Sequence, residues 1–119
     1  MRKTALLSLL VMVLVSSSFA AIAKDAEGPR NPLLMGLASF VIPGLGQAIQ
    51  GDFEKGLTHF LIAVAIGVGG GYLAYLTPYG FITPVIVGAH LVWAIYSAVD
   101  SYQMAVEFNK THGYSAASK

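Results

Sequence analysis

The stretch of sequence that decides the fold covers residues 57–76 and reads LTHFLIAVAIGVGGGYLAYL. Its 20 residues include no Asp, Glu, Lys or Arg. An α-helix of about 20 apolar residues spans the roughly 30 Å hydrocarbon core of a bilayer, because each residue adds about 1.5 Å. The stretch therefore predicts a membrane-spanning helix.

Two more uncharged stretches flank this one. Residues 82–99 (ITPVIVGAHLVWAIYSAV) predict a second spanning helix, whose later turns become amphipathic. Residues 33–49 (LLMGLASFVIPGLGQAI) carry Pro43 near their middle. An internal proline removes a backbone hydrogen bond, so this segment is expected either to bend while crossing or to re-enter. The fold class expected is all-α, an integral membrane helical hairpin or three-helix bundle over residues 33–110, with helices at 33–50, 53–76 and 82–109.

The first residues have the order of a secretory signal peptide. Positive residues 2–3 precede an apolar run at 5–15, and residues 21–23 (AIA) have the small-x-small form that signal peptidase accepts. The run rises only about 16 Å, which is too short for a span. We expect a signal peptide at 1–23, with an uncleaved signal anchor as the alternative. An exposed linker is expected at 24–32 and a flexible tail at 111–119.

The leader bears on orientation, because export places the residues after it on the outer side of the membrane. If residues 33–50 then cross, the C-terminus lies inside. If they only dip into the bilayer, the C-terminus lies outside.

The composition excludes several functional classes. Apolar residues make up 55% of the 119 residues and charged residues only 11%, whereas soluble domains carry about 25% charge. A net charge of +1 leaves no broad basic surface for nucleic acid. The chain has no Cys, hence no thiol chemistry, and His59 and His90 lack the spacing of metal ligands. With no nucleophile–base pair either, we expect no enzyme, cofactor or metal.

Small residues recur at helical spacing in all three apolar stretches. In lipid, such residues allow two helix backbones to approach closely, either within one chain or between copies. We expect packing within the chain, because short turns already place the helices side by side. The predicted helix-packing residues are Gly44, Ala48, Ala63, Gly67, Gly71, Ala94 and Ala98.

Polar side chains also lie at membrane depth. Pairing the second and third helices about the turn between them places His59 near Asp100, and pairing the first and second places Gln47 near Lys55. One interpretation is an interfacial cluster that fixes the helix register; the other is an ion or proton site, since ionisable groups at this depth are often functional. The predicted polar cluster comprises Gln47, Lys55, His59, His90 and Asp100.

Two short motifs carry a resemblance. Residues 38–47 (ASFVIPGLGQ) precede a Gly-Asp turn at 51–52, and residues 93–100 (WAIYSAVD) place Tyr96 four residues before Asp100. Together they resemble small bacterial membrane proteins with a Pro-Gly-x-Gly-Gln motif and, more loosely, the transmembrane-two hairpin domain family. The resemblance implies a membrane hairpin and leaves the function open.

Two functions are expected from these features. The first is a small non-enzymatic integral membrane protein of the bacterial inner membrane, structural or accessory to a larger assembly. Its partners would be the lipid bilayer and a second copy or another membrane protein. The alternative is a small channel or transporter subunit with a polar His/Asp path.

Overall fold

The computed structural model describes residues 28–78 and 80–114, together with six residues of the leader, Lys3, Leu6, Leu7, Leu10, Val13 and Leu14. All regular structure in this part of the chain is helical, which confirms the all-α class. The predicted signal peptide, apart from those six residues, lies outside the described residues, as do residues 24–27 of the linker and residues 115–119.

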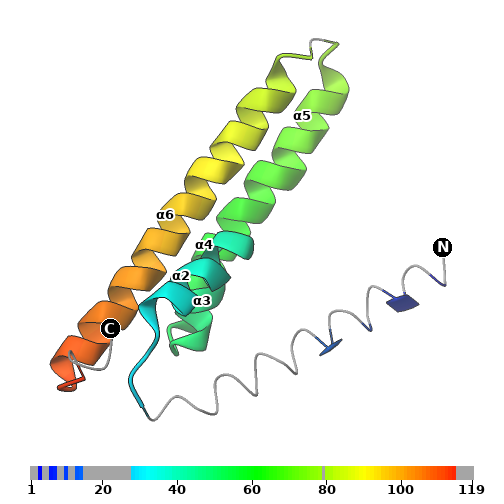
Figure 1. The fold of residues 1–119 in the computed structure, drawn as a ribbon. Coiled ribbons are helices and arrows are strands. Elements are labelled where there is room, and N and C mark those ends of the chain that lie inside the picture. Colours follow the sequence, from blue (N-terminus) through cyan, green and yellow to red (C-terminus); the bar gives the residue numbers. More distant parts are fainter. Residues whose placement is uncertain are drawn as a thin grey trace.

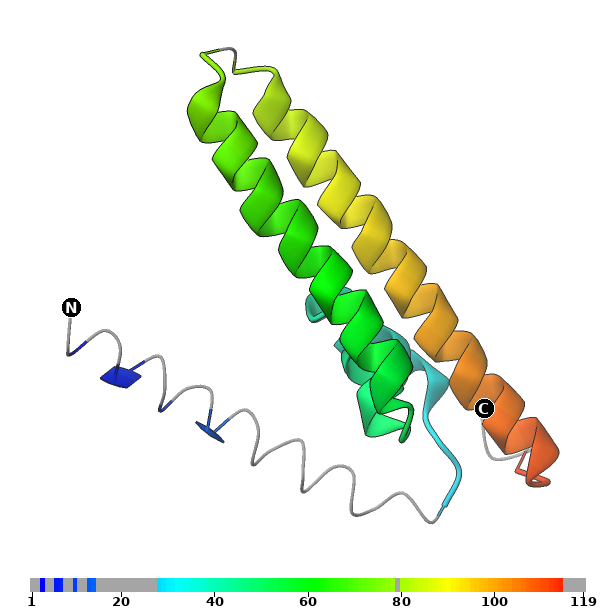
Figure 2. The same cartoon turned by 180° about the vertical axis from the view of Figure 1, so that it is seen from behind.

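A hairpin of two long helices forms the frame of the molecule (Figures 1 and 2). Its first arm runs without a break through α4 (Phe53–Val64), the π-helical turn η1 (Ala65–Gly69) and α5 (Gly70–Leu76). Its second arm is α6 (Ile82–Thr111). The arms contain 24 and 30 residues, and both are long and apolar enough to cross a bilayer.

Local chemistry sets where the first arm begins and the second ends. The Asp52 carboxylate accepts a hydrogen bond from the Lys55 backbone N–H at 3.0 Å, which caps the start of α4. The second arm ends beside Gly113, whose φ of 76° is the left-handed conformation that commonly stops a helix.

The single helix predicted over residues 33–50 is wrong. The structure instead has α2 (Pro32–Val41) and the short α3 (Leu45–Ile49), separated by a sharp reversal. Gly44 adopts a φ of 92°, a left-handed conformation that favours glycine. Pro43 cannot donate a backbone hydrogen bond, so the helix ends before it and the chain turns back.

Both ends of this segment lie at the open end of the hairpin, where the first arm begins; one end is beside Asn109 in the last turn of α6, and the other is beside Ser101, ten residues before α6 ends. The Arg30 N–H donates to Asn109 Oδ1 at 2.7 Å, and Gln50 Nε2 donates to the Ser101 carbonyl at 2.9 Å. At the tip, the Gly44 N–H donates to Ser97 Oγ at 2.9 Å. The tip thus reaches about 18 Å along α6, since 12 helical residues separate Ser97 from Asn109. Residues 31–50 thus run out to Gly44 and turn back, and this reversing stretch is called the re-entrant segment.

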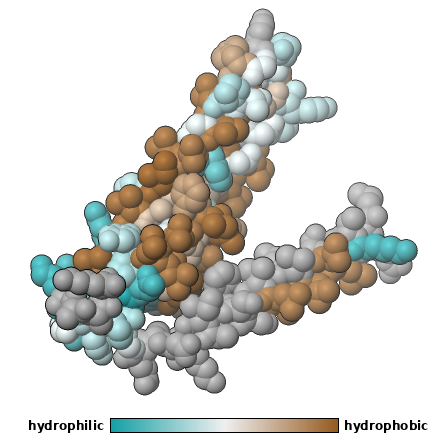
Figure 3. All heavy atoms as spheres, viewed as in Figure 1, coloured by the Kyte–Doolittle hydropathy of each residue, from teal (hydrophilic) through white to brown (hydrophobic). Residues whose placement is uncertain are grey.

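The interior of the molecule is small and polar, and its exterior is apolar. The largest side chains that are fully buried are Gln47, Asn109, Ser39, Ser97 and Ser101. Leu, Val and Phe side chains face outward, and hydrophobic residues cover much of the hairpin surface in Figure 3. A water-soluble domain has the opposite arrangement, with its large apolar side chains buried.

Candidate functional site

A polar stripe on α6 receives the re-entrant segment. Ser97, Ser101, Ala105 and Asn109 recur at every fourth position, and each is at most 1% exposed. Residues four apart share one face of a helix. This face therefore presents hydroxyl and amide groups to α2 and α3, where a soluble helix would present leucine.

Gln47 on α3 lies at the centre of the contact and is fully buried. Its Oε1 accepts a hydrogen bond from Ser39 Oγ at 2.6 Å. Its Nε2 donates to the Ser97 carbonyl at 3.1 Å and to Asp100 Oδ2 at 2.9 Å. Both protons and the oxygen of the amide are thus used, and one side chain links α2, α3 and α6.

Around Gln47 the backbones approach so closely that only glycine fits. Ser39 Oγ accepts from the Gly46 N–H at 2.7 Å. A Cβ at Gly46 would overlap the Ser101 hydroxyl and the Met35 carbonyl. Ser101 Oγ in turn donates to the Met35 carbonyl at 3.1 Å. The hydroxyl groups therefore serve as hydrogen-bonding spacers between closely packed helices.

An ion pair lies at the edge of this network. Lys55 Nζ is 2.8 Å from Asp100 Oδ1, and the two side chains are 39% and 19% exposed. Because Gln47 donates to the other carboxylate oxygen, Asp100 is held from both α3 and α4. A carboxylate partly withdrawn from water requires such donors to remain charged.

His59 lies beside the ion pair, inside an aromatic enclosure. Its ring is stacked on Tyr96 with 5.6 Å between centroids and lies 5.1 Å from Trp93. Trp93 Nε1 donates to the His59 carbonyl at 2.9 Å. His59 Nε2 is 3.9 Å from Asp100 Oδ2, while its Nδ1 is buried and has no hydrogen-bond partner in the described structure.

Arg30 closes the open end of the molecule. Its guanidinium lies 3.4 Å from the centre of the Phe108 ring, a cation–π arrangement, and Nη1 donates to Gln50 Oε1 at 3.4 Å. Partial burial lowers the pKa of Arg30 from its ordinary value, because the charged form loses hydration. Arg30 and Asn109 thus tie the entry of the re-entrant segment to the end of α6.

The structure brings four of the five predicted cluster residues together, namely Gln47, Lys55, His59 and Asp100. The fifth, His90, lies apart: it is exposed and lines a separate notch. Sequence reasoning missed the buried network residues Ser39, Gln50 and Asn109, and the partly buried Arg30. The four-residue spacing of the polar stripe on α6 was the signal that could have found Asn109.

The predicted helix-packing residues divide in the same way. Gly44 and Ala48 of the reversing stretch pack against Gly56 of α4. Ala63 and Ala94 are buried. The Ala98 carbonyl lies against Gly36 of α2. At Gly67 and Gly71 an added Cβ would meet nothing within 4 Å, so neither position is in close contact with another described segment. Gly70 takes over the contact, facing Ile86.

The arrangement is chemically a set of paired donors and acceptors that holds four helical segments in register. No group of three or more His, Asp or Glu residues that could bind a metal occurs among the described residues.

No protein-family model matches the chain, and no curated protein or solved structure is significantly similar to it.

Proposed function

We propose that the protein is a small non-enzymatic integral membrane protein, acting as a structural or accessory component of a membrane assembly. One observation carries this proposal: the polarity of the molecule is inverted, with amide and hydroxyl side chains buried and large apolar side chains exposed. Hydrocarbon, unlike water, favours such a surface and such an interior.

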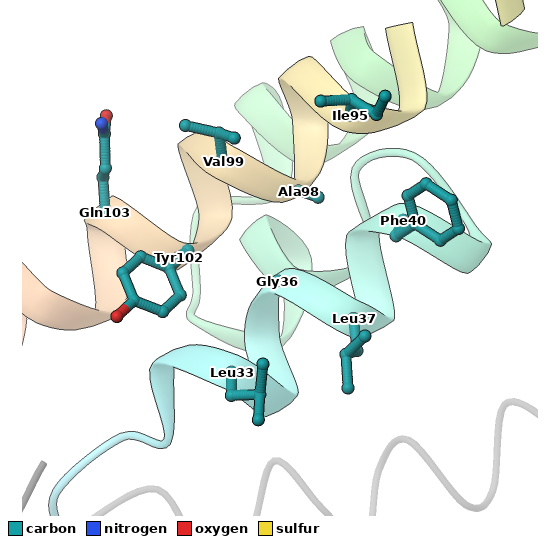
Figure 4. A pocket seen from close by; sticks show the side chains of 9 residues that line it. All are labelled: Leu33, Gly36, Leu37, Phe40, Ile95, Ala98, Val99, Tyr102 and Gln103. Carbon is teal, nitrogen blue, oxygen red and sulfur yellow. The ribbon is translucent and has the colours of Figure 1, made fainter. Parts of the chain in front are cut away.

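The apolar surface extends over the re-entrant segment as well as the hairpin. Figure 4 shows a groove between α2 and α6 that is open to the outside, with Leu33, Leu37 and Phe40 on one wall. Ile95 and Val99 form the other wall. In water this groove would be an aggregation hazard, whereas in a bilayer it lies against acyl chains.

A channel or transporter subunit is the less favoured alternative. A conducting path needs polar groups that face a solvated groove, whereas Asp100 is engaged by Lys55 and Gln47. His59 is enclosed by aromatic rings, and His90 lies elsewhere on the hairpin. These groups do not form one continuous polar path.

The leader and the bacterial resemblance support a bacterial inner membrane location. Residues 31–50 enter and leave at the open end, so they add no crossing. We propose that export places this end, with the C-terminus, on the outer side and the turn after Leu76 on the inner side.

The accessory role is tested by the mass of the native particle. We expect the full chain, extracted from membranes in a mild detergent, to migrate as a complex larger than one polypeptide. Light scattering that separates protein from detergent mass makes the measurement. A homogeneous monomer that retains its fold would contradict the accessory role while leaving membrane insertion untouched.

A further inference from the structure

A notch opens on the hairpin beyond the tip of the re-entrant segment. Phe40 and Val41, at the end of α2, border it, and Gly67 of η1 and Ile86 of α6 lie within it together with His90. The re-entrant segment covers the half of the hairpin nearest its open end, and above the tip the two arms are uncovered (Figures 1 and 2). The notch thus continues, toward the closed end of the hairpin, the surface that α2 and α3 cover near its open end.

His90 is the polar group of this notch. It lies eight residues after the start of α6, about 12 Å along the helix and so near mid-membrane. Its side chain is exposed, and its ring makes no hydrogen bond or ion pair with a described residue. An imidazole left unpaired in hydrocarbon is costly, and ionisable residues at such depth almost always face a protein partner.

Gly67 makes the notch accessible to another backbone. A Cβ built there meets nothing within 4 Å, and the same holds for Gly71 one turn further on. Gly67 also belongs to the π-helical turn η1, a rare conformation that occurs frequently at functional positions. Bare glycines on a membrane helix permit the close approach that helix association in lipid requires.

Resting on the proposed membrane location, we infer that this notch is the contact surface between two copies of the chain, with their His90 side chains hydrogen-bonded to each other. A neutral imidazole carries one donor and one acceptor, so the N–H of one ring can donate to the unprotonated nitrogen of the other. Across a twofold axis the two rings then hold opposite tautomers, and one nitrogen of each ring is paired. Twofold contacts are the commonest arrangement of homo-oligomers. An acyl chain in the notch would leave both nitrogens unpaired.

Cysteine crosslinking in native membranes tests the contact, and the Cys-free sequence makes the background clean. Leu91 lines the notch, whereas its neighbour Val92 lies at the same depth outside it; they are 48% and 69% exposed. We expect oxidation to convert Leu91→Cys into a species of twice the monomer mass. Val92→Cys is the matched control and should remain monomeric.

A second pair of variants tests the glycine. Gly67→Leu fills the notch, whereas Gly69→Leu places the same side chain in the same π-helical turn but outside the notch. Both positions are open in the monomer. We expect Gly67→Leu to reduce co-purification of two differently tagged copies about tenfold, and Gly69→Leu to leave it unchanged.

His90 is tested by replacement with and without hydrogen-bonding groups. His90→Leu should lose co-purification of the tagged copies, and His90→Gln, which keeps a donor and an acceptor, should retain it. Equal crosslinking at residues 91 and 92, no crosslinked dimer, or an adduct with a different protein would each overturn the inference. An adduct of different mass would leave the accessory role standing, whereas a native monomer would remove both.

Discussion

Gln47 links three helical segments through a single amide. Its place in an apolar stretch predicts membrane depth, but its immediate neighbours do not predict that it is fully buried. Its neighbours Gly46 and Ala48 are small, and the side chain becomes buried only because the chain reverses at Gly44. Sequence pairing placed Gln47 near Lys55; the structure adds that Asp100 holds both. The role of Gln47 therefore depends on the reversal at Gly44, which is held by contacts with residues distant in the sequence.

Replacing Gln47 should destabilise the fold without altering its surface. Gln47→Leu removes three interhelical hydrogen bonds, each worth about 0.6 kcal/mol in a membrane protein, so we expect a loss of about 2 kcal/mol. Thermal unfolding in detergent measures it. Gln103→Leu, at an exposed glutamine of α6, serves as control; an equal loss at both positions would show that the network contributes nothing.

Asp100 should matter for folding more than an ordinary surface carboxylate. Asp100→Asn leaves the Lys55 ammonium without its counter-ion, and we expect it to lower the yield of folded protein and its stability by about 1 kcal/mol, discounted for the exposure of Lys55. Glu107→Gln makes the same chemical change at an exposed position of α6. Full folded yield of Asp100→Asn with loss of a proton-dependent activity would favour transport instead.

Among the elements, the two long helices follow from the sequence and the re-entrant pair does not. Uncharged runs of sufficient length predict the helices observed at Phe53–Leu76 and Ile82–Thr111. Pro43 predicts that the helix of the first apolar run is interrupted, but the local sequence is the same whether the chain bends or reverses there. The choice depends on Gly44 meeting Gly56 and on the polar stripe of α6, which are contacts between distant residues.

The reversal itself can be tested with two glycines of nearly identical φ. Gly44 and Gly51 have φ values of 92° and 93°. A Cβ added at Gly44 would overlap the Gly56 carbonyl, whereas a Cβ added at Gly51 would meet nothing within 4 Å. Gly51→Ala should cost about 1–2 kcal/mol through backbone strain alone. Gly44→Ala should cost about 3 kcal/mol, because steric overlap adds to that strain. Equal losses in thermal unfolding would argue against the close contact of α3 with α4.

At the scale of the whole molecule, the re-entrant segment determines the topology that we propose. Both ends of residues 31–50 lie at the open end of the hairpin, beside Asn109 and Ser101 of α6, so the proposed membrane protein crosses the bilayer twice after the predicted leader. Lys55 and Lys110 also lie toward the open end, but the first hydrophobic segment usually sets the orientation. The open end is therefore expected outside.

A reporter fused after Lys119 checks this topology. An enzyme that folds only outside the inner membrane should be active there, and one that works only in the cytoplasm should be inactive. The same reporters placed after Leu76 should give the reverse pattern. Cytoplasmic activity at the C-terminus would show that residues 33–50 cross the membrane after all, or that the leader does not export them.

The inverted polarity of the molecule has its most direct test in alkaline carbonate extraction of cell envelopes without detergent. Peripheral and soluble proteins are released by this treatment, whereas integral proteins stay with the lipid. We expect the processed chain to remain entirely in the membrane pellet and to leave it only when detergent is added. Recovery of folded chain in the supernatant would contradict the account, because the exposed leucine, valine and phenylalanine side chains would then have water as their solvent.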